Sequence, residues 1–231
     1  MLDLARIRAI TIDLDDTLWP IWPTMMRAET TLHAWFRQHA PATAVLHATP
    51  QWREIRNAVN ITHPDLAHDL TALRREAIRQ ALLQSGDDPT LANAAFEVFF
   101  EERQRVDLFD DALPALDFLS SRYPLVALSN GNADVQRVGI GRYFCAAFSA
   151  RTLGVGKPDP RIFQVGARAA GVAVEQVLHI GDDAQLDGVG ALNVGMQMAW
   201  VNREGHAWPK GSLHQPHVTV PQLRALCELF G

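Results

Sequence analysis

The feature that most constrains the fold of this sequence is a series of short apolar runs that alternate with amphipathic stretches after residue 107. Short apolar runs are typical of strands buried on both faces, and the stretches between them have helical spacing. Strands that alternate with helices predict a mostly parallel sheet with right-handed crossovers. The predicted strands are residues 125–128, 147–149, 177–180, 198–201 and 217–220, and the predicted helices are 113–121, 134–143, 160–170 and 187–192.

Another run of the same kind, at residues 8–14, stands apart from the others. From Thr24 to Val106 the apolar residues recur at helical spacing, and no strand pattern interrupts them. Prolines and one glycine turn divide this region into about four helices. The sequence therefore predicts an α/β core of residues 1–18 and 107–231, interrupted after its first strand by a helical cap domain of residues 19–106.

Composition excludes several classes of protein. A length of 231 residues and a hydrophobic content of 48% are typical of a globular chain. The formal net charge of -5 and the absence of a basic stripe argue against a nucleic-acid partner. No segment resembles a signal peptide or a membrane span, so we expect a cytoplasmic protein with no membrane partner. Cys145 and Cys227 have no paired spacing and are expected to be ordinary core residues.

Two carboxylates follow the first predicted strand. Asp13 and Asp15 lie two residues apart where the apolar run ends. In open parallel sheets, ligands bind beyond the carboxyl ends of the strands. Acidic side chains at this position are suited to a metal-dependent or nucleophilic site.

Polar groups also follow the later strands. Each group is ordinary by itself, because such residues are common in turns, on surfaces and in first helical turns. In succession, however, the strand ends offer a hydroxyl with an amide, then a lysine, then a second group of carboxylates. This order indicates one shared site, and its residues are Ser129, Asn130 and Gly131, then Lys157, and finally Asp182, Asp183 and Asp187.

The segments DLDDT, SNG, GKPDP and GDDAQLD resemble, in this order, the four signature motifs of the haloacid dehalogenase (HAD) superfamily. The resemblance covers nearly the whole chain, because that superfamily inserts a helical cap where this sequence has its helical block. The segments PLVALSNGNA, LHIGDDAQLD and AHDLTALRREAI are also similar to the bacterial flavin-pathway phosphatases of the superfamily. Those enzymes hydrolyse flavin mononucleotide (FMN) and the phosphoribitylamino-uracil intermediate of riboflavin synthesis. The resemblance implies a Rossmann-like α/β core and a phosphatase that acts on a small phosphorylated metabolite.

The resemblance also implies roles for the acidic residues. Asp13 would attack phosphorus and form an aspartyl phosphate, and Asp15 would transfer protons to the leaving group and from water. Carboxylates gathered around a phosphate need a counter-charge, which a hard cation such as Mg²⁺ supplies. Asp13, the Asp15 carbonyl and Asp182 would bind Mg²⁺ directly. Asp183 and Asp187 would act on it through water or by orienting its ligands.

Phosphate binding is implied for a second set of residues. Ser129, the Asn130 backbone and Lys157 would bind the phosphoryl oxygens, over which charge spreads in the transition state. Thr17 would hold the loop and the nucleophile in place at the same phosphate site. Asp16 has no assigned role.

Substrate choice is expected to come from the cap. Trp19 and Trp22 follow the first motif, and either could stack on a flavin or pyrimidine ring or instead pack the cap against the core. Four polar residues could contact a ring or ribityl chain, although such residues usually lie on solvated helix faces. They are His63, His68, Arg74 and Arg75.

Rival classes fit the sequence less well. The glycines near Lys157 complete neither the dinucleotide-binding pattern nor a P-loop. A phospho-receiver module would be shorter and uncapped. A 2-haloacid dehalogenase would use an Asp nucleophile but lack the counterpart of Asp15, and a general small-metabolite phosphatase acting on sugar phosphates, phosphoglycolate or nucleotides remains an alternative. The loop 202–216 and the oligomeric state receive no assignment.

Overall fold

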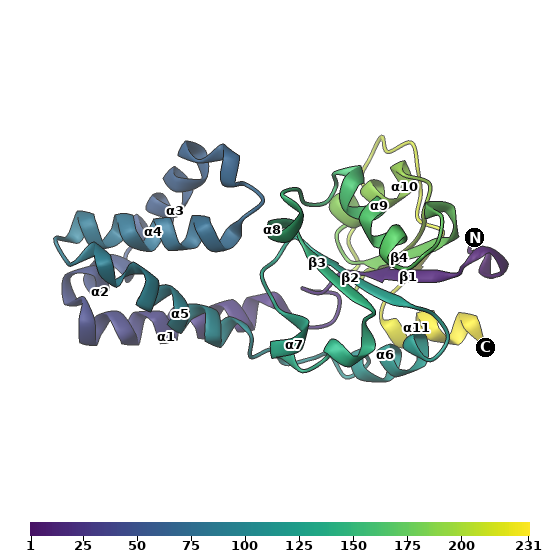
Figure 1. Ribbon diagram of the computed structural model, residues 1–231, viewed down its shortest axis with the longest axis horizontal. Coiled ribbons are helices and arrows are strands. Elements are labelled where there is room, and N and C mark those ends of the chain that lie inside the picture. The colour runs from purple at the N-terminus through teal and green to yellow at the C-terminus, as the bar shows by residue number, and fades with distance from the viewer. The chain divides into compact units, whose positions relative to one another are not determined.

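In the computed structural model, which describes residues 1–231, six short segments pair as parallel strands of one sheet (Figure 1). They are β1 (Ala9–Ile12), β2 (Leu125–Ser129), β3 (Ala146–Ser149), β4 (Val177–Gly181), β5 (Gln197–Val201) and β6 (Val218–Val220). Their order is β3-β2-β1-β4-β5-β6, and every adjacent pair is parallel. The predicted α/β fold class with a Rossmann-like parallel sheet is confirmed.

Strand β1 lies at the centre of the sheet and determines where a ligand site can form. It pairs with β2 on one side and with β4 on the other. All residues of β1, β2, β4 and β5 are buried, as expected for parallel strands covered on both faces. The strand order reverses between β1 and β4, and in open α/β sheets ligands bind beyond the carboxyl ends of the strands at such a point.

Helices cover both faces of this sheet. Figure 1 shows α9 (Pro160–Ala169) and α10 (Gly190–Asn193) on one face, and α6 (Ala112–Ser120) and α11 (Leu223–Cys227) on the other. Gly166 lets α9 approach the strands closely, because a Cβ there would lie 3.0 Å from side-chain atoms of both Leu128 and Thr11. Shorter elements complete the unit: α7 (Val135–Val138), α8 (Ala150–Leu153), a π-helix (Ala184–Val189), and 3-10 turns at Leu4–Arg6, Gly141–Tyr143, Val174–Gln176 and Glu228–Phe230.

Several local predictions need correction. The six strands lie where they were predicted, with ends shifted by one or two residues. The helix predicted at 134–143 is wrong as one element, because Gly139, with a φ of 90°, ends α7 after one turn. The helix predicted at 187–192 begins earlier, as the π-helix that ends at Val189. Cys145 is exposed and Cys227 is partly exposed, so neither is the core cysteine that was predicted.

The chain divides into two units, Met1–Pro20 with Asp107–Gly231 and, separately, Ile21–Val106. The second unit is helical and has five α-helices rather than about four. Pro41 and Pro50 each lie in the first turn of a new helix, where a missing N–H is tolerated. Its helices are α1 (Ile21–His39), α2 (Pro41–His47), α3 (Pro50–Thr62), α4 (Leu70–Ser85) and α5 (Ala92–Arg103), with 3-10 turns at Pro64–Leu66 and Pro89–Leu91.

The helical unit has its own apolar core. Leu32 and Phe36 of α1, Ile78 of α4 and Phe96 of α5 are all buried within it. Local signals set the limits of α4: the Asp69 side chain accepts a hydrogen bond from the Ala72 amide at its start, and a left-handed glycine follows its end. None of the helices in either unit is both long and apolar enough to cross a membrane.

Substitution of Leu128 tests the packing of the sheet against α9. Its side chain is fully buried in a cluster with Ile162 and Phe163. We expect Leu128→Ala to lower the free energy of unfolding by about 2–5 kcal/mol, because it deletes buried methyl groups and leaves a cavity. Urea unfolding measures this loss. The matched control Leu213→Ala, at a residue that is 95% exposed, should change stability by less than about 0.5 kcal/mol. Equal effects of the two substitutions would contradict this packing.

Candidate active site

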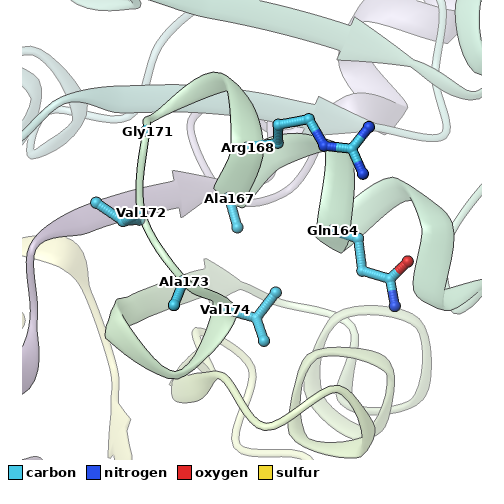
Figure 2. Close-up of a pocket in the computed structure, with 7 residues that line it drawn as sticks. All are labelled: Gln164, Ala167, Arg168, Gly171, Val172, Ala173 and Val174. Carbon is cyan, nitrogen blue, oxygen red and sulfur yellow. The ribbon is translucent and has the colours of Figure 1, made fainter.

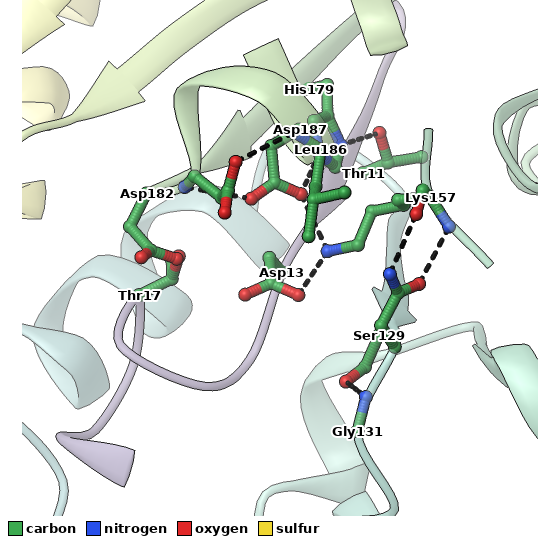
Figure 3. Close-up of polar contacts among 12 residues, drawn as sticks. Thr11, Asp13, Thr17, Ser129, Gly131, Lys157, His179, Asp182, Leu186 and Asp187 are labelled. Carbon is green, nitrogen blue, oxygen red and sulfur yellow. Dashed lines mark hydrogen bonds and ion pairs between the residues drawn. The ribbon is translucent and has the colours of Figure 1, made fainter. Parts of the chain in front are cut away.

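The acidic motifs meet beyond the carboxyl ends of β1 and β4 (Figure 3). Asp13 follows β1, and its amide donates to the Ile180 carbonyl of β4 at 2.9 Å. Asp182 follows β4 directly. One carboxylate oxygen from each of Asp13, Asp182 and Asp187 lies within 4.8 Å of the others. Sequence reasoning expected these residues in one site, and the structure brings them together.

Lys157 supplies the positive charge inside this cluster. Its ammonium group donates to Asp13 Oδ1 and, at 2.6 Å, to Asp187 Oδ1. Burial alone would lower the pKa of Lys157, but the charges of Asp13 and Asp187 outweigh it and raise that pKa. Despite its burial, Asp187 has a pKa of about 2, because Lys157 and a hydrogen bond from His179 favour the carboxylate. Lys157 and Asp187 therefore form a fully ionised pair.

The other two carboxylates have too little positive charge nearby. Burial, with the charges of Asp187 and Asp182, raises the pKa of Asp13 well above its usual value, although Lys157 opposes this. Burial, followed by the charge of Asp187, raises the pKa of Asp182 to about 7. One lysine thus faces three acids, and a further cation would relieve the excess negative charge.

The donor set fits a hard divalent cation such as Mg²⁺. Only carboxylate oxygens converge, and the one nearby imidazole, that of His179, is turned toward Asp187. Asp187 is the least available of the three acids, since its Oδ1 accepts from Lys157 and His179 and its Oδ2 accepts from the Asp183 amide at 3.1 Å. Asp13 and Asp182 are the better ligands.

Asp187 requires a residue without a side chain at position 181. A Cβ on Gly181 would lie 2.3 Å from Asp187 Cγ, so only glycine leaves room for this carboxylate. Asp183 has a different environment, because its Oδ1 accepts from the amides of Gln185 and Leu186 at 2.8 and 2.7 Å. Asp183 therefore caps the π-helix that carries Asp187.

The predicted phosphate-binding residues lie around the same cluster. Thr17 Oγ1 donates to Asp182 Oδ1 at 3.1 Å, and Ser129 Oγ accepts from the Gly131 amide at 2.9 Å. The Asn130 side chain pairs with the Lys157 backbone, donating to its carbonyl at 2.8 Å and accepting from its amide at 2.7 Å. Sequence reasoning considered only the backbone of Asn130 and missed that its side chain positions Lys157.

Trp19 contacts Asp15 rather than a ligand. Its side chain is fully buried, and its indole Nε1 donates to Asp15 Oδ1 at 2.8 Å. Asp16 makes this possible by adopting a left-handed φ of 57°, which turns the chain so that its amide donates to the Trp19 carbonyl at 2.7 Å. A ring with no exposed surface cannot stack on a substrate, so Trp19 is removed from the candidates for ring binding.

Residues at the end of β5 and in the following loop donate hydrogen bonds to the backbone of both acidic motifs. Sequence reasoning did not detect these contacts. Trp200 Nε1 donates to the Asp182 carbonyl at 2.7 Å. Arg203 Nη2 donates to the Thr17 carbonyl at 3.0 Å and to Asp111 Oδ1 at 3.0 Å. No motif marks these residues, because their partners are distant in the chain. The loop 202–216 thus contributes at least Arg203 to the frame of the site.

Three of the four polar candidates in the helical unit have partners within it: Arg74, Arg75 and His63, whose Nδ1 lies 3.2 Å from the Val59 carbonyl. Arg74 is buried and donates to Glu29, whose pKa falls to about 2 because hydrogen bonds from His47 and Arg74 outweigh the effect of burial. Arg75 lies over the Phe96 ring, 4.5 Å from its centroid. Trp22, in contrast, is 74% exposed and has a free ring surface.

A separate hollow of about 430 Å³ lies beside α9 and the segment that leads into β4 (Figure 2). Its lining includes Gln164, Arg168 and Val172. Because this segment enters the amino end of β4, the hollow is distinct from the acidic cluster beyond the carboxyl end. None of the predicted site residues lines it.

Comparison with known proteins identifies the family of this chain. Residues 7–195 match the haloacid dehalogenase-like hydrolase family, to which the chain therefore belongs. The chain is 32% identical to the 5-amino-6-(5-phospho-D-ribitylamino)uracil phosphatase YigB of Escherichia coli, over 98% of both chains. It is 36% identical to a phosphoserine phosphatase of Thermus thermophilus, over 56% of this chain and 55% of that one.

Among solved structures, a crystal structure of a 2-haloacid dehalogenase from Pseudomonas syringae pv. Tomato is similar, with a TM-score of 0.89 and 36% identity. That similarity covers 97% of this chain and 98% of the other. Family membership makes the protein a hydrolase, and the phosphatase relatives support a phosphatase.

The raised pKa of Asp182 predicts a pH-dependent effect of its removal. A carboxyl group whose pKa rises on folding, here from 3.8 to about 7, destabilises the fold progressively as pH rises through that interval. Asp182→Asn removes this ionisation but keeps an oxygen that can accept from Thr17. With EDTA present to exclude divalent cations, the variant should melt at a higher temperature than the wild type at about pH 8, with a smaller difference at about pH 5.

Thermal unfolding by circular dichroism measures this difference. The control Asp65→Asn, at an exposed carboxylate of the helical unit, should show no such pH dependence. If Asp182→Asn instead destabilises the protein equally at both pH values, the excess negative charge inferred for the cluster is wrong.

Proposed function

We propose that this protein is a Mg²⁺-dependent phosphatase that hydrolyses a small phosphomonoester through an aspartyl phosphate on Asp13. One observation carries the proposal: a buried ammonium group, that of Lys157, contacts Asp13 within a cluster that has an excess of carboxylates. An electron-rich nucleophile and a fixed cation lie side by side, as phosphoryl transfer requires. The phosphatase relatives support the same reaction class.

The reaction divides into two displacements. A carboxylate oxygen of Asp13 attacks phosphorus, the bond to the ester oxygen breaks, and Asp15 gives a proton to the leaving alkoxide. Asp15 then takes a proton from a water molecule, which attacks the phosphorus of the aspartyl phosphate. Inorganic phosphate leaves and Asp13 is regenerated. The indole of Trp19 holds Asp15 in place through its hydrogen bond.

Several groups are suited to hold the phosphoryl oxygens during these steps. Ser129 Oγ already accepts from the Gly131 amide, so its own proton is directed to another acceptor. The Lys157 ammonium and the backbone amide of Asn130 provide further donors. Charge develops on the phosphoryl oxygens in the transition state, and fixed donors stabilise it without reorganisation.

Asp13 and Asp182, with the Asp15 carbonyl, would hold the Mg²⁺. When bound, the ion offsets the charge of the carboxylates and polarises the phosphoryl group. Asp187 would not be a ligand, because it stays paired with Lys157. Asp183 would orient the π-helix that carries Asp187.

A 2-haloacid dehalogenase is the second candidate, because a structure described as such an enzyme is similar over nearly the whole chain. Both reactions use an Asp nucleophile. Only ester hydrolysis needs an acid for the leaving alkoxide, since a halide leaves without a proton. Asp15, held by Trp19, supplies that acid and favours phosphate hydrolysis.

For the substrate, we propose FMN or the phosphoribitylamino-uracil of riboflavin synthesis, with the helical unit serving as the cap that selects it. The similarity to the phosphatase YigB, 32% identity over 98% of the chain, supports this choice. Trp22 lies in the first turn of α1 and is 74% exposed, so its ring is available to stack on a flavin or pyrimidine. A sugar phosphate, phosphoglycolate or a nucleotide would be the substrate of a more general phosphatase.

The nucleophile is tested by Asp13→Asn with p-nitrophenyl phosphate as substrate. Because an amide does not form the covalent intermediate, kcat should fall at least about 10³-fold while the circular dichroism spectrum is retained. Asp159→Asn is the control, since that residue is a helix cap in the third motif and asparagine also caps helices. EDTA should abolish wild-type turnover and Mg²⁺ restore it.

Two outcomes would reject this proposal. One is substantial turnover by Asp13→Asn, and the other is steady phosphate release by the wild type without a divalent cation. Release of chloride from 2-chloropropionate at a rate above that of phosphate from the ester would favour the dehalogenase instead.

Trp22 is tested by comparing substrates with and without a ring system. Loss of stacking in Trp22→Ala should lower kcat/KM about tenfold for FMN and the phosphoribitylamino-uracil but leave phosphoglycolate nearly unchanged. Met26→Ala, one helical turn away and 68% exposed, is the matched control. If the two flavin-pathway compounds rank below sugar phosphates in wild-type kcat/KM, the narrower substrate is wrong and the general phosphatase remains.

A further inference from the structure

A series of hydrogen-bonded polar side chains extends from the interior of the sheet to the site. Side chains alternate between the faces of a strand. Thr11 of β1 and Asp13, which directly follows β1, therefore lie on the same face of the sheet. Thr11 is paired in register with His179 of β4. Both are fully buried, and Thr11 Oγ1 lies 2.8 Å from His179 Nδ1.

The series continues from His179 to the nucleophile. His179 Nε2 lies 3.0 Å from Asp187 Oδ1, which also accepts from Lys157 at 2.6 Å. Lys157 in turn donates to Asp13. Four hydrogen bonds therefore connect a threonine in the sheet to the residue that attacks phosphorus (Figure 3).

Hydrogen-bonding rules fix the direction of each bond. Asp187 is ionised and can only accept, so His179 Nε2 must carry a hydrogen. Burial lowers the pKa of His179, and a neutral ring then has a lone pair on Nδ1. Thr11 must therefore donate to Nδ1. Every polar atom of the imidazole is satisfied in one tautomer only.

Close packing keeps the His179 ring in this orientation. Phe163 of α9 meets it edge to face, with ring centroids 5.1 Å apart and an angle of 88° between the planes. Phe163 is itself confined, because a Cβ on Gly190 would lie 2.8 Å from its ring. The imidazole therefore has little space in which to turn over.

We propose that His179, oriented by Thr11, is a positioning residue that keeps Asp187 on Lys157 and thereby fixes Lys157 against Asp13. This inference rests on the proposed function of Asp13. Asp187 has an alternative, because its oxygen lies within 4.8 Å of those of Asp13 and Asp182 and could turn toward a cation bound there. His179 holds the carboxylate away from that alternative, so that the lysine remains aligned with the nucleophile.

Nuclear magnetic resonance tests the tautomer without any assay of activity. Long-range ¹H–¹⁵N correlation of the ¹⁵N-histidine-labelled protein reports which ring nitrogen carries the proton, and loss of one signal set in His179→Gln assigns it. We expect a neutral ring protonated on Nε2, with an Nδ1 shift that changes in Thr11→Val. A ring protonated on Nδ1, or on both nitrogens, at neutral pH overturns the proposal.

Paired variants test the consequence for catalysis. His179→Leu should lower kcat about 10–100-fold with a smaller change in KM, a range typical of residues that orient functional groups. His179→Gln can still donate to Asp187 and should recover part of this loss. At the other end, Thr11→Val removes the hydroxyl at nearly constant shape and should lower kcat, whereas Thr11→Ser keeps the hydroxyl and should not.

A purely structural role would lower the melting temperature of the Leu and Val variants and leave the kcat of folded protein unchanged, which overturns the proposal. Equal kcat for the Gln and Leu variants also overturns it. If these variants do not fold, the tautomer of His179 measured in the wild-type protein still tests the proposal. Failure of the proposed function appears separately, as a wild type without phosphatase turnover.

Discussion

The buried ammonium group of Lys157 is the interaction on which the rest of the site depends. Removing carboxylates from water is costly unless each is paired and hydrogen-bonded, and a cluster of acids beyond the central strands would otherwise be strongly unfavourable. Lys157 neutralises Asp187 completely and contacts Asp13, but it cannot neutralise Asp182 as well. The site is therefore stable enough to form and still electrostatically incomplete, which is the condition in which a divalent cation binds with advantage.

Much of this could be predicted from sequence because two physical signals are local. All six strands are short, largely apolar runs, and four of them are buried throughout, so their positions could be predicted. Their carboxyl ends lie at one edge of the sheet, so Asp13, Lys157 and Asp182 could be expected together. The rest depends on partners far apart in the chain. The side chain of Asn130 reaches the Lys157 backbone, and Arg203 reaches Thr17, but neither contact leaves a pattern in the sequence. The predicted end of the helix at 134–143 was wrong for a related reason. Gly139 ends α7 through its positive φ, and the sequence does not show that angle.

Uncharged donors have a distinct part in this arrangement. Trp19 and Trp200 each give one indole N–H to an acidic motif, the first to the Asp15 side chain and the second to the Asp182 backbone. An indole orients an acceptor without adding charge, and its large ring is at the same time part of the core. A second lysine in either place would neutralise acids that the proposed reaction needs. The tryptophans therefore fix geometry and leave the electrostatic balance to Lys157.

The π-helix at Ala184–Val189 has a consequence for how the fourth motif tolerates insertion and deletion. Its wide turn is visible in the Gly188 amide, which donates at 3.0 Å to the carbonyl of Asp183, five residues earlier. The Asp187 amide donates to the same Asp183 carbonyl at 3.0 Å, so the number of residues between Asp183 and Asp187 sets the angular position of Asp187 around the helix axis. Deleting one residue between Asp183 and Asp187 would rotate the Asp187 side chain by about 100° and carry its carboxylate away from Lys157, even if every acidic residue of the motif were kept. The spacing in this motif therefore determines the direction in which the Asp187 side chain points. The number of residues within the turn matters more than their identity.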